Sequence, residues 1–181
     1  RTVASMQKIL LIGPLKVYPA TTIQMIEAAG YTVEQAETQA AGLELARAHN
    51  PNLIICDWDL RDSNGHEVLK RIRKDPQVAV TPFILLSSLY DHRHLRQTME
   101  LGADDCLLRP FSDETLIAAI STRLKQQETI TNHYLSHLRL AAEHLNRLSY
   151  YDNLTKLPNH LLFEQRFKHL IETSTQPVAL I

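Results

Sequence analysis

Short apolar runs alternate with amphipathic stretches through the first two thirds of the chain. Apolar runs that end in turn-forming residues predict buried strands, and helical periodicity between them predicts helices. The predicted strands cover residues 9–12, 31–33, 53–56, 83–86 and 106–108. The predicted helices cover residues 21–29, 40–49, 66–74 and 92–100. This alternation predicts a doubly wound α/β domain, in which a five-stranded parallel sheet is covered by helices on both faces.

The residues that follow the predicted strands are the first place to look for chemistry. In open parallel sheets, functional side chains gather at the carboxyl ends of the strands. The residues at those ends are Gly13, Pro14, Asp57, Ser87 and Arg109. We therefore expect these five residues to share one edge of the sheet.

A different pattern begins after Pro110, because neither glycine nor proline occurs again before Pro158. One stripe advances in alternating steps of three and four residues, and eight of its ten members are apolar: Ile117, Ile120, Leu124, Gln127, Thr131, Tyr134, Leu138, Ala141, Leu145 and Leu148. That spacing is typical of a coiled coil. We predict a long helix over residues 113–150 that forms a parallel homodimer, and the alternative is a helix that folds back on its own domain. The predicted dimer seam is Tyr134, Leu138, Ala141, Leu145 and Leu148.

Composition narrows the classes of partner. Hydrophobic residues make up 44% of the chain, charged residues 22%, and the formal net charge is -1. This balance argues against a nucleic-acid or membrane-surface binder. The two cysteines, Cys56 and Cys106, lie in apolar stretches without metal-ligand spacing, as expected of reduced thiols. No apolar run reaches the ~18 residues of a membrane span, and residues 1–5 do not resemble a signal peptide. We therefore expect a cytoplasmic protein.

The residues at the strand ends resemble the receiver domain of two-component response regulators (the CheY-like domain). The resemblance covers about residues 8–124, and we place the domain at residues 6–124. Residues 51–57, P-N-L-I-I-C-D, look like the third strand and phospho-acceptor of that family, which makes Asp57 the expected acceptor. Ser87 matches the residue that senses the phosphoryl group. The resemblance implies a phosphorelay with a cognate histidine kinase and a Mg²⁺ cofactor.

The metal side of this site departs from the family pattern. Mg²⁺ requires several oxygen ligands, and the family supplies an acidic pair directly after the first strand. Here Gly13 and Pro14 occupy those positions. Asp59 either lends a substitute carboxylate or repels the incoming phosphate. We expect Mg²⁺ to bind weakly.

The phosphoryl side departs as well. The lysine of the fifth strand is replaced by Arg109, whose planar guanidinium does not substitute simply for an ammonium. The aromatic switch position holds Cys106, which has no ring. We expect Arg109 to pair with Asp57 and phosphorylation to be impaired. A receiver that retains some phosphorylation is the alternative.

Residues 152–159 read D-N-L-T-K-L-P-N and resemble the D-x-L-T-x-L-P-N signature that opens GGDEF diguanylate cyclase domains. Phe163, Phe167 and Leu170 continue the first helix of that domain, and residues 177–181 resemble its first core strand. The resemblance assigns residues 151–181 to an N-terminal fragment and gives Asn159 a role in guanine recognition. The catalytic residues of the family lie beyond this fragment, so we expect no enzyme activity from this chain.

Together these patterns predict a regulatory receiver module that controls a cyclic di-GMP output through dimerisation. The parent protein would be a diguanylate cyclase or a GGDEF–EAL protein. The alternative is a constitutive pseudo-receiver that acts as a protein-interaction or ligand-binding dimerisation module.

Overall fold

The computed structural model describes residues 6–14, 16, 18–88, 91–152, 154–155 and 157–173, without the side chains of residues 148, 149 and 173. The chain divides into two compact units, Arg1–Glu128 and Thr129–Ile181, and each is described by itself. No helix in the described part of the chain is both long enough and apolar enough to cross a membrane.

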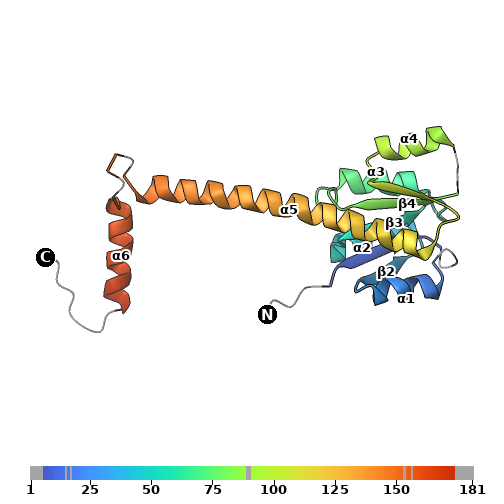
Figure 1. The fold of residues 1–181 in the computed structure, drawn as a ribbon, viewed down its shortest axis with the longest axis horizontal. Coiled ribbons are helices and arrows are strands. Elements are labelled where there is room, and N and C mark those ends of the chain that lie inside the picture. The colour runs from blue at the N-terminus through green and yellow to red at the C-terminus, as the bar shows by residue number, and fades with distance from the viewer. Residues whose placement is uncertain are drawn as a thin grey trace. The chain divides into compact units, whose positions relative to one another are not determined.

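The first unit is the predicted doubly wound α/β domain (Figure 1). Its strands are β1 (Lys8–Ile12), β2 (Thr32–Ala36), β3 (Leu53–Asp57), β4 (Phe83–Ser87) and β5 (Asp105–Leu108). They pair in parallel in the order β2-β1-β3-β4-β5. The helices between them are α1 (Ala20–Ala28), α2 (Gln39–His49), α3 (Gly65–Lys74) and α4 (His92–Glu100). Every predicted strand and helix of this domain is therefore present.

The three central strands are apolar except at one end, where Lys8, Asp57 and Ser87 lie, because both faces of the sheet are covered. Successive strand residues point to opposite faces, and the two faces form separate layers of the core. Leu10 and Ile12 pack in the layer under α2 and α3. Ile9 and Leu11 pack in the layer under α1 and the start of α5 (Asp113–Tyr150).

The sequence predicts a strand that ends at residue 33, whereas β2 continues to Ala36. Glu34 and Gln35 interrupt the apolar run on which the prediction relied. An edge strand has a neighbour on one side only, and its polar side chains reach solvent. The hydrophobic pattern therefore marks this strand only in part.

The stripe of the long helix α5 is buried in the first unit and exposed in the second. Ile120 and Leu124, both members of the predicted coiled-coil stripe, are buried at 0% and 4% exposure in the core of the first unit. The first turns therefore pack on their own domain, within the range predicted for the receiver. In the second unit the stripe is solvent-exposed, with exposed fractions of 67% for Tyr134, 65% for Leu138 and 64% for Leu145.

The described residues of the GGDEF-like signature are joined by local hydrogen bonds in the second unit. The Asp152 carboxylate accepts hydrogen bonds from the backbone of Leu154 at 3.1 Å and Thr155 at 2.8 Å. Asn159 then caps α6 (His160–Thr173) by accepting from the Leu162 backbone amide at 3.1 Å. The strand predicted over residues 177–181 lies outside the described residues.

Candidate functional site

Strand register brings the predicted site residues to one edge of the sheet. Asp57 ends β3 and pairs in register with Leu86 of β4. Ser87 ends β4 and pairs with Leu108 of β5, directly before Arg109. Three neighbouring parallel strands therefore present an aspartate, a serine and an arginine side by side at their carboxyl ends, as the sequence predicts.

Asp57 is buried, with only 2% of its surface exposed, and both of its carboxylate oxygens are engaged. Arg109 donates from Nη1 to Oδ2 over 2.6 Å, which is the expected ion pair. The backbone amide of Asp59 donates to Oδ1 over 2.8 Å. The Arg109 guanidinium also lies 5.8 Å from the centre of the Phe111 ring, within the range of a cation–π contact. A fixed internal cation therefore neutralises the carboxylate.

On the metal side of Asp57, an aromatic ring occupies the region where the family resemblance places an acidic pair. Gly13 and Pro14 contribute no side-chain oxygen there. A Cβ atom on Gly13 would lie 2.9 Å from the Asp57 Cβ and 3.0 Å from the Tyr18 Cε2. The sequence does not reveal that the Tyr18 ring lies here, because Tyr18 belongs to a loop with no periodic pattern.

These surroundings do not fit Mg²⁺, the cofactor that the resemblance implies. The ion requires octahedral oxygen ligands with protein carboxylates among them. The side chain of Asp59, which either lends a substitute carboxylate or repels the phosphate, is exposed to solvent. No group of three or more His, Cys, Asp or Glu side chains in the described residues is placed to hold a metal ion.

Ser87 is fully buried and forms a hydrogen bond with a histidine of α4. Its Oγ lies 3.2 Å from the Nε2 of His94, which is itself 9% exposed. In the family resemblance Ser87 senses the phosphoryl group, and here its hydroxyl contacts His94 of α4. The sequence does not reveal this contact, because it joins two elements through one polar pair.

A second histidine extends this contact from α4 to α3. The ring of His66 stacks on that of His94 with centroids 5.0 Å apart, and both meet Trp58 edge-on. The Thr98 hydroxyl donates to the His94 carbonyl over 2.9 Å, so its single proton is used there. His66 must then donate from Nε2 to Thr98 over 2.7 Å. Burial, assisted by His94, lowers the pKa of His66 from 6.5 to about 4, so this ring is neutral at pH 7.

Cys106, the predicted switch position, is half-buried against the core layer under α2 and α3. Burial, together with the neighbouring Asp105, raises its thiol pKa to about 11. A protonated thiol is a poor nucleophile and a poor metal ligand. The contact that the structure shows for Cys106 is therefore packing against the core.

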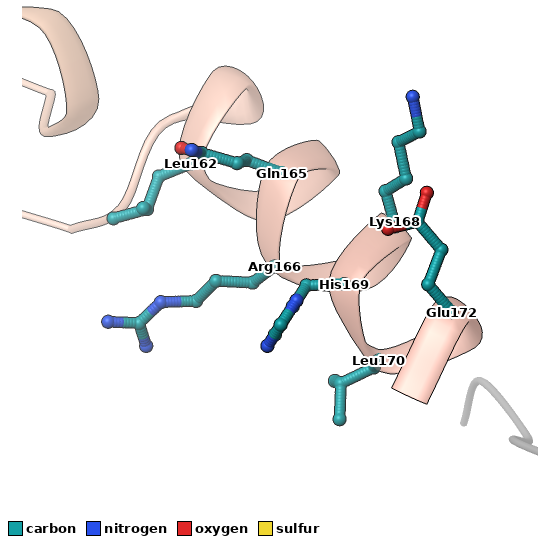
Figure 2. Close-up of a pocket in the computed structure, with 7 residues that line it drawn as sticks. All are labelled: Leu162, Gln165, Arg166, Lys168, His169, Leu170 and Glu172. Carbon is teal, nitrogen blue, oxygen red and sulfur yellow. The ribbon is translucent and has the colours of Figure 1, made fainter. Parts of the chain in front are cut away.

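The second unit has a hollow of its own. Figure 2 shows its lining, which comes entirely from α6: Leu162, Gln165, Arg166, Lys168, His169, Leu170 and Glu172. Because a single helix lines it, it is an open helix face rather than a walled site. The chemistry-bearing groups remain those at the carboxyl edge of the sheet.

Comparison with known proteins agrees with this geometry. The family model described as "Response regulator receiver domain" matches residues 15–121, more than half of the chain. The chain therefore belongs to the receiver domain family of two-component response regulators, and the matched region is a non-catalytic regulatory domain. A CheY-like receiver domain from Methanospirillum hungatei superposes with a TM-score of 0.64 at 26% identity, covering 69% of this chain and 98% of that one. Chemotaxis response regulator CheY4 of Vibrio cholerae gives 0.61 at 25% identity, with coverages of 66% and 99%.

Curated relatives extend well beyond the matched region. The DNA-binding dual master transcriptional regulator RpaA of Synechocystis is 34% identical over 105 residues, which are 58% of this chain and 44% of that protein. The phosphate regulon transcriptional regulatory protein PhoB of Pseudomonas aeruginosa is 31% identical over 101 residues, or 56% and 44%. The chain thus spans less than half the length of either relative.

Proposed function

We propose that this chain is a receiver whose Asp57 does not take up a phosphoryl group, and which sets the geometry of a dimeric helix leading to an output domain. The observation that carries the proposal is the buried 2.6 Å contact between Arg109 and Asp57. Phosphorylation would require a carboxylate oxygen of Asp57 to form a bond to phosphorus while the donor's leaving group departs. That oxygen already accepts a charge-assisted hydrogen bond, which reduces its reactivity as a nucleophile.

The negative charge of the phosphoryl group also argues against phosphorylation of Asp57. Phosphoryl transfer depends on metal ions that neutralise the developing charge. Arg109 is a cation, but it is committed to Asp57 and is bulkier than the lysine of the family pattern. Neither a histidine kinase nor a small-molecule donor is then expected to modify Asp57 efficiently.

The test is to incubate the protein with acetyl phosphate and Mg²⁺ and to measure its intact mass. We expect no gain of a phosphoryl group. The control variant Asp57→Asn identifies modification at any other site. A mass gain in the unmodified protein that disappears in Asp57→Asn would refute the proposal and would make Asp59 the suspected metal ligand.

The output that we infer is of the GGDEF type and is coupled to a parallel homodimer. Its support is the D-N-L-T-K-L-P-N segment of residues 152–159 and the apolar, exposed side chains Tyr134, Leu138 and Leu145 on α5. In that family resemblance, Asn159 contributes to guanine recognition. In this structure its side-chain oxygen caps α6.

A DNA-binding output is the second candidate, because RpaA and PhoB are named as transcriptional regulators. Their similarity covers the receiver region and does not reach the output. Formation of cyclic di-GMP from GTP by the protein as the cell makes it would support the first candidate, and sequence-specific DNA binding would support the second. A constitutive interaction module without either activity is the remaining alternative.

A further inference from the structure

Tyr18 is a buried residue of the β1–α1 loop that contacts the phosphorylation pocket from within the protein. Only 4% of its surface is exposed, and it belongs to the core layer under α1 and α5. Its hydroxyl donates to the Ile12 carbonyl over 3.2 Å. The ring is thus held at the end of β1, next to the position from which the family resemblance projects its first carboxylate.

Gly13 and Tyr18 are sterically complementary. A Cβ on Gly13 would approach the Tyr18 ring to 3.0 Å and its hydroxyl oxygen to 3.5 Å. A side chain at position 13 would therefore require small shifts of the Tyr18 ring and of the Asp57 Cβ, which would lie 2.9 Å away. Gly13 thus leaves the space that the Tyr18 ring borders.

The chemistry of the ring is unlike that of a metal ligand. Burial, and then the nearby Cys56 and Asp57, raise the pKa of the Tyr18 hydroxyl well above 10, while Arg109 opposes them. The phenol therefore stays protonated at neutral pH and donates its proton to Ile12. A neutral phenol whose proton is donated to Ile12 lacks the carboxylate charge that Mg²⁺ requires of its protein ligands.

We propose that Tyr18 is a built-in cover of the metal side of the pocket, which excludes divalent cations from Asp57 even when a carboxylate is supplied nearby. The proposal deepens the proposed function, because it names the residue that closes the same site. Arg109 occupies the phosphoryl side of Asp57 and Tyr18 the metal side. The two residues come from different parts of the fold, since Arg109 follows β5 and Tyr18 lies between β1 and α1.

The experiment supplies a carboxylate and then removes the cover. Pro14 is half-buried beside Gly13, and Pro14→Asp restores one acidic side chain without adding a Cβ at residue 13. Three variants are compared: Pro14→Asp alone, Pro14→Asp with Tyr18→Ala, and Pro14→Asp with Tyr18→Phe. Mg²⁺ is titrated into each, and the fluorescence of Trp58 reports binding, since it is the single tryptophan of the chain and follows Asp57 directly.

We expect the double variant Pro14→Asp, Tyr18→Ala to bind Mg²⁺ roughly ten-fold more tightly than Pro14→Asp, Tyr18→Phe. A change of this size is seen when the surroundings of a metal site are altered. Phenylalanine keeps the ring, so it should behave like Pro14→Asp alone. Equal affinities in the alanine and phenylalanine pairs would overturn the proposal. If circular dichroism shows that the alanine variant is unfolded, Tyr18→Val, which retains part of the buried apolar surface, replaces it in the same comparison.

The outcome separates this inference from the proposed function. If the unmodified protein resists acetyl phosphate while the alanine and phenylalanine pairs bind Mg²⁺ equally, the cover is wrong and the silent receiver stands. If the unmodified protein is phosphorylated at Asp57, the proposed function fails, whatever the Tyr18 comparison gives.

Discussion

Arg109 supplies the cation that pairs with the buried carboxylate of Asp57. Its side chain is 28% exposed and that of Asp57 only 2%, so the pair lies at the boundary between core and solvent. A buried carboxylate without a partner is costly, because it has lost its water and gained nothing in return. The guanidinium satisfies it through one nitrogen and keeps a second contact with the Phe111 ring.

Replacing Arg109 with methionine should therefore destabilise the protein strongly, because Asp57 would remain buried without its cation. Removing one partner of a buried ion pair costs about 3–5 kcal/mol. Urea denaturation measures the change. The matched control is Arg71→Met, which alters an exposed arginine of α3 and should change stability by less than about 0.5 kcal/mol. A similar, small loss in both variants would contradict a structural role for the pair.

At this scale the sequence predicts which residues meet but not what surrounds them. Asp57, Ser87 and Arg109 follow strands whose apolar runs are unmistakable, so their positions at one edge could be deduced. Tyr18 and His94 could not, because a loop ring and one polar pair leave no periodic signal. Their contacts depend on the path of the β1–α1 loop and on how α4 packs, and both are determined by tertiary structure.

The helices α3 and α4 are joined by a buried polar network rather than by apolar contacts alone. His66 of α3 is 5% exposed and is satisfied by Thr98 of α4. Trp58, which follows Asp57 directly in the chain, packs edge-on against both histidine rings. Such a network fixes one arrangement of the helices only while every member keeps its hydrogen bond.

The low pKa of His66 makes this interface sensitive to acid. Its folded-state pKa of about 4 lies below the unfolded value of 6.5 because of burial, the neighbouring His94 and Lys70, with Glu67 opposing them. Between these values the unfolded chain binds the extra proton. Stability should therefore be fully present above pH 6.5 and fall as the pH falls toward 4, by up to about 3 kcal/mol.

Urea midpoints measured from pH 7 to pH 4 test this prediction. In His66→Gln the side-chain amide can still donate to Thr98 but does not titrate, so the loss of stability on acidification should be smaller. His92→Gln, at an exposed position of the same helix pair, should follow the unmodified protein. Parallel pH profiles for all three proteins would rule out His66 as the source of the acid sensitivity.

For the whole molecule, the sequence predicts the order of strands and helices in the receiver domain, whereas the dimer and the GGDEF fragment stay predictions. The order of five apolar runs and their intervening helices fixes a parallel sheet, and the comparisons confirm it. The coiled-coil stripe is ambiguous, because apolar spacing of three and four marks a core-facing helix as well as a dimer seam. Ile120 and Leu124 belong to the first kind, and only burial in the structure separates them from the rest.

The remaining stripe predicts the association state of the protein. Leu138 and Leu145 are 65% and 64% exposed in one chain. A symmetric dimer buries each of them twice, and each buried leucine contributes about 1.5–3 kcal/mol. Four such side chains give an upper limit of about 6–12 kcal/mol, a range that includes the ~8 kcal/mol of a micromolar dimer. The double variant Leu138→Asp, Leu145→Asp should therefore be monomeric by multi-angle light scattering.

Leu140 supplies the matched control for this experiment. It is 63% exposed, almost the same as the two seam residues, but it lies two positions after Leu138 and therefore about 200° around the helix. Leu140→Asp adds a charge on the same helix away from the seam, so it should remain dimeric. If both the double variant and Leu140→Asp remain dimeric, the chains associate through another surface. If both become monomeric, the added charge disrupts the helix itself, and the seam has no special part in association.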